Sequence, residues 1–471
     1  MTPTIRRIPA PVTAASALAV ALVTASPLAG AAVPIPIPTV VGPIASVTPG
    51  DPSRNYTFLA TPPDLAVRGY VEEEYFISGT ACRYTGVGLG TATIAACGFP
   101  YQTRIVVRRP ASAAAFNGTV IAEWQNVTAQ YDVDHYWLES SAHLMREGYA
   151  WVGISAQRAG IQPLPPPANP IVSINTLRAW SPLRYGGLDV TVGGTVLDDA
   201  LRFDIYSQAV KALRSPVDVD PLGPLDPSVV IAAGTSQSGS NLASYHNSIA
   251  PLYERVVDAF FIGESRGVLR TDQPAPVLRL LSEVDVASSF APLDAPNYRH
   301  WEVAGASHAD AGFIESITPL LIRDQVVQLA PVCTRNPLSR IPKRYVYHAA
   351  WNSMDAWVRS GVLPPVAPRI TFAAGVITRD ADGNALGGIR LSEHHVPTAY
   401  NGTGNGPPVF CTLFGVHEPF SAQRLAALYR NHGRYVSQVA RANEVNVAAG
   451  FLLPADSDES TANAAQSRVG Q

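Results

Sequence analysis

The chain has 471 residues, of which 47% are hydrophobic and 15% are charged, and its formal net charge is −3. This composition is typical of a globular protein with a large core, in one big domain or two ordinary ones. The chain lacks the excess of basic residues that nucleic-acid binding requires, so we expect no nucleic-acid partner.

The first 31 residues have the pattern of a signal peptide. Arg6 and Arg7 form a basic start, residues 12–24 are rich in Ala, Leu and Val, and residues 29–31 form a small-x-small cleavage site. The apolar stretch is too short to cross a bilayer, which takes about 20 apolar residues. We therefore expect a secreted or cell-envelope protein with no integral membrane segment after cleavage.

The sequence contains four cysteines: Cys82, Cys97, Cys333 and Cys411. An even number in an exported chain indicates two disulfides. We predict the pairs Cys82–Cys97 and Cys333–Cys411, because each pair then closes within one region of the chain. A zinc site is the alternative, but no Cys-x-x-Cys spacing supports it.

Strands and helices alternate through the first part of the chain. Apolar and β-branched runs predict strands over residues 67–77, 103–109, 118–124, 149–155, 229–231, 276–281 and 300–304. Helical patterns cover residues 136–147 and 202–213, and a proline-rich loop covers 162–170. This alternation predicts an α/β fold whose mainly parallel sheet is flanked by helices.

The pattern changes from about residue 314. Helices are predicted over residues 321–329, 349–358 and 421–442, and a hairpin over 375–391 turns at Asp382-Gly383. The tail, residues 455–471, is small and polar, and we expect it to be disordered. We thus expect one domain over residues 32–454, with a catalytic core at about 67–315 and a C-terminal helical and hairpin extension at about 316–454.

The stretch from Ser228 to Ser248 is typical of a nucleophile elbow. A buried strand, Val229-Val230-Ile231, runs into the turn Gly234-Thr-Ser-Gln-Ser-Gly239, and a helical pattern follows. Such a turn exposes a serine hydroxyl beside the free N–H groups of a helix start. We place the nucleophile at Ser236, with Ser238 as the alternative, because Gly-x-Ser-x-Ser-Gly is one change from Gly-x-Ser-x-Gly-Gly.

An elbow serine needs a base and an acid that orients the base. The strand at 276–281 ends in Ser282-Glu-Val-Asp285, and the strand at 300–304 ends in Gly305-Ala-Ser-His308. Both ends meet the sheet edge that carries the elbow, in the order serine, acid, histidine. We predict Asp285 as the acid, with Glu283 as the alternative, and His308 as the base.

These residues predict acyl transfer from an ester to water without a cofactor. Ser236 attacks the carbonyl, His308 takes its proton, and Asp285 stabilises the imidazolium. We expect the oxyanion to be held by the N–H of Gln237 and by one N–H from Asn126 or Val127, in the loop after the strand at 118–124.

Two other patterns could suggest metal sites, and we interpret neither as one. His394 and His395 are adjacent and have no further ligand pattern around them, so we expect loop residues. In Asp380-Ala-Asp-Gly-Asn384 the glycine comes too early for a calcium loop and no closing Glu follows, so a tight hairpin turn fits better.

The chain resembles a family of exported bacterial proteins named for an alpha/beta hydrolase domain. The resemblance rests on Glu123-Trp-Gln-Asn-Val-Thr128, the elbow at 234–239, Ser282-Glu-Val-Asp285, Trp301-Glu-Val-Ala-Gly-Ala-Ser-His308 and Asp382-Gly-Asn-Ala-Leu-Gly-Gly388. It covers most of the chain from about residue 69 to 454. It implies the α/β-hydrolase fold and a serine hydrolase, and it does not imply a substrate beyond a small-molecule or polymer ester.

Overall fold

The computed structural model describes Met1 and residues 32–62, 65–163, 174–290, 292–327 and 332–471. Residues 33–471 form one compact unit. Residues 2–31 of the expected signal peptide and residues 164–170 of the proline-rich loop lie outside the described residues. Among the described helices, none is both long and apolar enough to span a bilayer.

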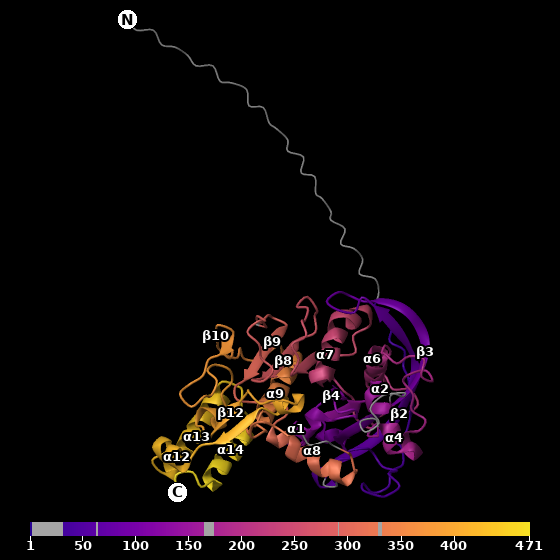
Figure 1. Ribbon diagram of the computed structural model, residues 1–471. Helices are drawn as coiled ribbons and strands as arrows, with labels where there is room; N and C mark the ends of the chain where they lie inside the picture. Colours follow the sequence, from indigo (N-terminus) through magenta and orange to yellow (C-terminus); the bar gives the residue numbers. More distant parts are fainter. Residues whose placement is uncertain (2–31, 63–64, 164–173, 291, 328–331) are drawn as a thin grey trace. The chain divides into compact units, whose positions relative to one another are not determined.

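A nine-stranded sheet runs through this unit (Figure 1). In spatial order its strands are β1 (Thr39–Val41), β2 (Tyr70–Thr85), β3 (Thr93–Pro110), β5 (Ala150–Ile154), β4 (Thr119–Trp124), β6 (Val229–Thr235), β7 (Ala259–Gly263), β8 (Val277–Ser282) and β9 (Tyr298–Val303). Pairs from β1 to β5 are antiparallel, and all pairs from β5 to β9 are parallel. The predicted mainly parallel sheet is confirmed.

The parallel strands are buried on both faces of the sheet. Since successive side chains of a strand point to opposite faces, each strand contributes residues to two cores. In β6, Val230 and Ala232 join the core that includes α6 (Arg202–Arg214) and α7 (Ser236–Ser244). The alternate residues Val229, Ile231 and Ala233 join the core on the other face, which includes α1 (His135–Arg146) and α9 (Arg344–Ser360). The sheet is thus covered on both faces, as the strand and helix alternation predicts.

Shorter elements complete the connections in this part of the chain. They are η1 (Ala66–Arg68), η2 (Ala113–Ala115), α2 (Arg158–Ile161), α4 (Leu177–Trp180), α5 (Pro182–Tyr185), η3 (Tyr245–Ile249), η4 (Ala250–Leu252) and α8 (Ala311–Arg323).

β2 and β3 form a hairpin that is longer than the sequence pattern predicts. Cys82 and Cys97 lie opposite each other in it and form a disulfide. Residue 67, where we expected the first strand to begin, lies in η1 instead. The extra strand length is largely exposed, above all in β3, and includes Gly98 and Pro100, so it shows neither the alternation nor the β-branched run that indicates a strand.

Besides α9, the C-terminal extension contains two small sheets and five helices among the described residues. They are β10 (Phe372–Ala373), β11 (Val376–Ile377), α10 (Ser392–His395), β12 (Ala399–Gly402), α11 (Val409–Phe414), β13 (Val416–Pro419), α12 (Ala422–Leu428), α13 (His432–Ala448) and α14 (Pro454–Gln466). The extension also covers the last strand of the central sheet, because Ile389 N donates to Glu302 O across 2.7 Å and Ala304 N donates to Ile389 O across 3.0 Å.

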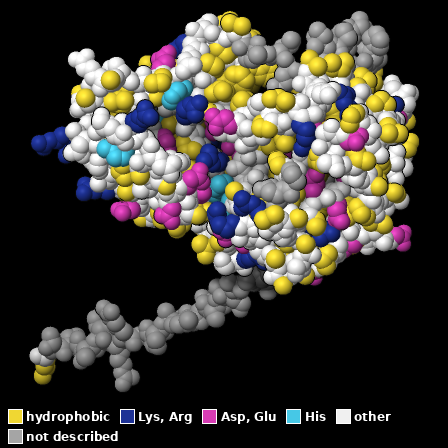
Figure 2. Space-filling view, turned by 90° about the horizontal axis from the view of Figure 1, so that it is seen from below, with side chains coloured by type: hydrophobic (Ala, Val, Ile, Leu, Met, Phe, Trp, Pro, Cys, Tyr) yellow, Lys and Arg dark blue, Asp and Glu magenta, His cyan; other side chains and the backbone are white. Residues whose placement is uncertain are grey.

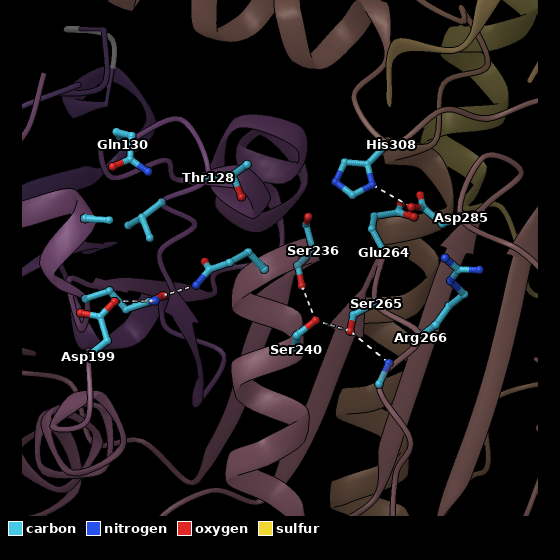
Figure 3. A pocket seen from close by; sticks show the side chains of 15 residues that line it. Thr128, Gln130, Asp199, Ser236, Ser240, Glu264, Ser265, Arg266, Asp285 and His308 are labelled. Carbon is cyan, nitrogen blue, oxygen red and sulfur yellow. Dashed lines mark hydrogen bonds and ion pairs between the residues drawn. The ribbon is translucent and has the colours of Figure 1, made fainter. Parts of the chain in front are cut away.

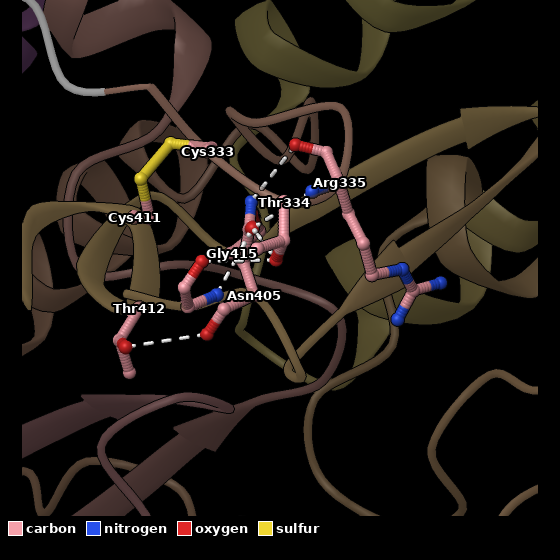
Figure 4. Close-up of a disulfide and its surroundings, with 8 residues drawn as sticks. Cys333, Thr334, Arg335, Asn405, Cys411, Thr412 and Gly415 are labelled. Carbon is pink, nitrogen blue, oxygen red and sulfur yellow. Dashed lines mark hydrogen bonds between the residues drawn. A yellow bond between two sulfur atoms is a disulfide. The ribbon is translucent and has the colours of Figure 1, made fainter. Parts of the chain in front are cut away.

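The second disulfide, Cys333–Cys411, closes a C-terminal strap, which we define as residues 333–341 and 411–417 (Figure 4). Asn405 joins the two halves of this strap. Its Nδ2 donates to Gly415 O across 2.8 Å, and its Oδ1 accepts a backbone N–H of the other half across 3.2 Å. Both predicted cysteine pairs are therefore present in the structure.

Three predictions for the C-terminal part are wrong. Residues 455–471 are not disordered, because α14 covers most of them and packs against α13 (Figure 1). The expected single helix over 421–442 is two helices, α12 and α13, with a break at residues 429–431. The helix expected over 321–329 is instead the end of α8, which stops at Arg323.

The surface mixes charged and apolar side chains. On the face in Figure 2, acidic and basic side chains lie among apolar ones.

Candidate active site

Ser236 is the first residue of α7 and directly follows β6. Its φ is +57°, in the left-handed region that costs a residue with a side chain about 1–2 kcal/mol. A Cβ on Gly234 would lie 2.9 Å from Ser238 O, and one on Gly239 would lie 2.8 Å from Gly263 O. Glycine is required at both positions because the strand, the turn and the helix approach so closely.

Ser236 and Ser238 have different surroundings. Ser236 lines a cavity, and its hydroxyl points between Thr128 and His308 (Figure 3). Ser238 is fully buried, and its Oγ donates to Thr235 O across 2.8 Å and accepts from Thr235 N across 3.1 Å. The hydroxyl of Ser238 therefore fastens the turn and has no access to the cavity.

Asp285 and His308 form a close pair at the ends of β8 and β9. His308 Nδ1 lies 2.8 Å from Asp285 Oδ1, and Ser282 Oγ donates to Asp285 Oδ2 across 2.5 Å. The other ring nitrogen of His308 faces the cavity (Figure 3). Among the described residues no hydrogen bond joins Ser236 Oγ to His308; such bonds are often long in a free enzyme and tighten when substrate binds.

The pair changes the titration of both groups. Burial alone lowers the pKa of His308, but the adjacent Asp285 carboxylate outweighs burial and raises this pKa above its ordinary value. Burial likewise opposes ionisation of Asp285, but the imidazolium and the hydrogen bonds to His308 and Ser282 hold the pKa of Asp285 well below its usual range. The charged form of the pair, imidazolium with carboxylate, is therefore the stabilised one.

Glu283, the alternative acid, lies elsewhere. Its carboxylate is buried, accepts from Gly305 N across 2.6 Å and forms an ion pair with Arg379 across 2.8 Å. It thus holds the start of the loop that leads to His308, and the structure does not bring it to the imidazole.

The loop after β4 contacts the elbow directly. Asn126 Nδ2 donates to Thr235 O across 2.9 Å, while the backbone N–H of Asn126 donates to Val133 O across 3.3 Å. This corrects the expectation that the backbone N–H of Asn126 is free for an oxyanion. Within the described residues no hydrogen bond engages the N–H of Val127, which lines the cavity together with Gln237.

The cavity has a volume of about 760 Å³, and polar side chains are numerous in its lining, which exposes about as much apolar as polar surface (Figure 3). Besides the residues already named, it is lined by Gln130, Gln157, Ala159, Asp199, Ser240, Glu264, Ser265, Arg266 and Gly267. Gln157 was not identified from the sequence. Its Oε1 accepts from Trp124 Nε1, Gln237 Nε2 and Asn241 Nδ2 at 2.9–3.0 Å, so it ties β4 to the elbow helix.

Glu264, at the end of β7, is a second residue that the sequence pattern missed. Its carboxylate lies within 4.8 Å of ligand atoms of Asp285 and His308, a spacing that could hold a metal ion. Lys343 Nζ lies 2.7 Å from Glu264 Oε1, however, and supplies a positive charge there. The three groups therefore fit an ion-pair network better than a metal site, and no described cluster of three possible ligands includes His394 or His395.

A family model described as an alpha/beta hydrolase domain matches residues 40–462. No curated protein matches the chain. Similar solved structures include an a/b serine hydrolase without lid from Xanthomonas campestris, at 12% identity and a TM-score of 0.26, which covers 54% of this chain and 97% of that one.

A cold-adapted esterase from an Arctic intertidal metagenomic library is also similar, at 12% identity and a TM-score of 0.24, covering 54% of this chain and 95% of that one. The family match, which spans most of the sequence, carries the assignment. It agrees with the parallel sheet and with the strand-turn-helix at Ser236. The chain therefore belongs to the alpha/beta hydrolase domain family.

Proposed function

We propose that the chain is a serine hydrolase that cleaves carboxylic esters through an acyl-enzyme. The observation that carries this proposal is the placement of Ser236. It has a left-handed backbone at a helix start, beside a cavity that an Asp285-bound imidazole of His308 also lines. Strained residues of this kind cluster at active sites, where the surrounding structure has to hold them.

In this mechanism His308 accepts the Ser236 proton while Oγ attacks the ester carbonyl carbon. Asp285 holds the ring with Nδ1 protonated and stabilises the imidazolium that forms. The imidazolium then gives its proton to the leaving alcohol oxygen, and the acyl group stays on Ser236. Water activated by the neutral His308 attacks the acyl-enzyme, which releases the acid and restores the serine.

The negative oxygen of the tetrahedral intermediate needs two donors. We assign these to the backbone N–H groups of Gln237 and Val127. Gln237 is the second residue of α7, so its N–H has no partner within the helix and lies at the positive end of the helix dipole. Loss of one such donor costs on the order of 3 kcal/mol of barrier.

Hydrolysis of p-nitrophenyl acetate by wild type and Ser236→Ala tests the proposal. We expect Ser236→Ala to lose at least about 10³-fold in kcat, as removal of a catalytic serine does in related chemistry. Ser244→Ala is the matched control, because Ser244 lies on the exposed side of the same helix. Equal rates in wild type and Ser236→Ala contradict the assignment of Ser236. If Ser238→Ala is inactive and Ser236→Ala is active, the nucleophile is Ser238.

Two further functions use the same fold. An acyltransferase or lactonase uses the same three residues, and it is distinguished by transfer of the acyl group to an added alcohol or by turnover of lactones. A catalytically silent scaffold binds a polysaccharide or a partner protein instead. A fluorophosphonate probe that fails to label Ser236 favours this last function.

The polar side chains that line the cavity offer binding partners for an ester with hydrophilic groups near the scissile bond. Hydroxyl and amide side chains, among them Thr128, Gln130 and Ser265, can bind such groups by hydrogen bonds. A panel of esters that differ in acyl length and in the polarity of the alcohol tests this. Faster turnover of long-chain apolar esters contradicts it.

We also propose that the chain is exported, with residues 1–31 removed. The signal-peptide pattern and the two disulfides support this, because disulfides form and persist in oxidising compartments. N-terminal sequencing of the mature protein tests this proposal. A protein in the culture supernatant that still begins at residue 1 or 2 contradicts cleavage.

A further inference from the structure

Glu264 and Lys343 form an ion pair inside the protein, directly behind the Asp285–His308 pair. Both side chains are fully buried, and Nζ lies 2.7 Å from Oε1. The chain has two lysines, and this one precedes α9, in the C-terminal extension. A fully buried charge pair is costly to desolvate and contributes little net stability, so its presence calls for a role other than stability.

Lys343 also holds the backbone of the histidine loop. Nζ donates to Ser307 O across 3.0 Å and to His308 O across 2.9 Å. Its three protons thus reach one carboxylate and two consecutive carbonyls, which satisfies the ammonium group completely. The position of the His308 backbone therefore depends on a residue that lies 35 positions further along the chain.

Glu264 is held just as completely. Oε2 accepts from Ser282 N across 2.7 Å, and Oε1 accepts from Tyr347 OH across 3.1 Å in addition to Lys343. Burial and the neighbouring Asp285 raise the pKa of Glu264 to about 7, although Lys343 opposes this. Glu264 therefore titrates near neutral pH, and above about pH 7 both Glu264 and Asp285 carry a negative charge beside the imidazole.

Other ionisable groups face the pair from the surrounding helices. Glu139 of α1 and Asp310 at the start of α8 both act on Lys343, and burial raises the pKa of each. His135 of α1 is buried nearby, and burial keeps its pKa low, so it adds no charge near neutral pH. Arg344 of α9 also acts on Glu139 and Asp310, so Lys343 and Arg344 together balance these acids.

We propose that Glu264 and Lys343 are a positioning pair, which fixes the His308 loop and balances the charge around the imidazole. The proposal rests on the proposed role of His308 as the base. Lys343 fixes the backbone through two carbonyls, and Glu264 cancels the charge of Lys343 so that it does not oppose protonation of His308.

The two roles separate in variants. In Glu264→Gln the shape is kept, but the unpaired Lys343 ammonium disfavours the imidazolium, so we expect the pKa of His308 to fall by about 1. In the double variant Glu264→Gln/Lys343→Met both charges are gone, so this pKa returns toward the wild-type value. In this double variant the carbonyls of Ser307 and His308 have lost their donor. We therefore expect a kcat at least about 10-fold below that of the wild type, with little change in KM.

The test is an NMR titration of the His308 imidazole in nitrogen-labelled full-length protein, with the resonance assigned by a His308→Gln variant. Rates of p-nitrophenyl acetate hydrolysis are measured from pH 5 to 9 on the same samples. Glu254→Gln is the matched control, because it removes one negative charge as Glu264→Gln does, from a partly exposed acid that pairs with the other lysine, Lys211, across 2.9 Å.

An unchanged His308 pKa in Glu264→Gln overturns the charge role, and a double variant with wild-type kcat overturns the positioning role. A fall of the same size in Glu254→Gln overturns the charge role, because it shows a general effect of losing one negative charge. Glu264→Gln keeps the side-chain volume, so it decides the charge role even where Lys343→Met does not fold. The NMR titration does not depend on turnover. A wild type that hydrolyses no ester therefore refutes the proposed function but leaves the pKa values of His308, and the test of the charge role, unaffected.

Discussion

Asn126 Nδ2 donates to the backbone carbonyl of Thr235 across 2.9 Å, which fastens the loop after β4 to the residue before Ser236. The same loop carries Val127, whose N–H we assign to the oxyanion. Together with the pairing of β4 and β6, this hydrogen bond sets the distance between the two halves of the proposed oxyanion site.

We predict that Asn126→Ala lowers kcat by about 10- to 100-fold, because a misplaced donor loses much of the stabilisation of the developing charge. The stability loss is about 1–3 kcal/mol, for the buried hydrogen bond to Thr235 and the one accepted from Thr128 N. Steady-state rates and thermal melts measure the two effects. The control is Asn297→Ala, which removes hydrogen bonds to Thr271 O and Gln273 O at the other end of β9, and a loss of kcat as large in that variant contradicts the prediction.

Ser236→Gly tests the backbone strain at the elbow. Glycine adopts a φ of +57° without steric cost, whereas alanine does not. We expect Ser236→Gly to be inactive but about 1 kcal/mol more stable than the equally inactive Ser236→Ala. Urea unfolding of the two variants measures the difference. A less stable glycine variant shows that the conformation carries no strain.

In the proposed mechanism activity depends on pH through His308, because the imidazole has to be neutral to accept a proton. Its pKa is raised, so we expect kcat/KM to fall below an apparent pKa that is higher than the ordinary value of about 6.5. Asp285→Asn removes the charge that raises it. The acid limb then moves to lower pH, and the plateau falls by about 10³- to 10⁴-fold. Profiles from pH 5 to 9 show this, and an acid limb that does not move contradicts it.

The two disulfides have different expected effects on catalysis. Cys333–Cys411 closes the strap that supports the histidine loop, because Ala309 N donates to Leu413 O across 3.2 Å and Ser339 Oγ donates to Gly305 O across 2.7 Å. We predict that replacing both cysteines with serine costs about 4 kcal/mol of stability and also lowers kcat.

The Cys82–Cys97 pair is the control for this experiment. It closes a shorter loop of the β2–β3 hairpin, so its serine variant loses about 3 kcal/mol and keeps its kcat. Urea unfolding and rates at a temperature where both variants are folded separate the effects. Equal kcat values in the two variants contradict the role of the strap.

Much of the site could be predicted from the sequence because its signals are local. The elbow is a contiguous strand, turn and helix, and Asp285 and His308 each end a strand that its own residues indicate. Lys343 and Glu264 lie 79 residues apart, and neither has a motif around it. Their meeting depends on where α9 packs, which no local pattern contains.

The wrong prediction for the tail has a similar cause. The small polar residues of α14 indicate disorder by composition, yet Asp456 is buried and bonds to His348 Nδ1 across 2.9 Å. Ser460 and Ala464 lie on the same buried side of this helix. A polar helix that is held by specific hydrogen bonds leaves no apolar stripe from which it could be predicted.

The donors and carbonyls that support the His308 loop come from Lys343, Ser339 and Leu413, all of which follow the last strand of the sheet. A chain still being synthesised can therefore complete the sheet and the elbow long before its base is held in place. We expect hydrolytic competence to be the last property that the chain acquires. Under the proposed export, this delay keeps the unfinished chain inactive on the side of the membrane where it is made.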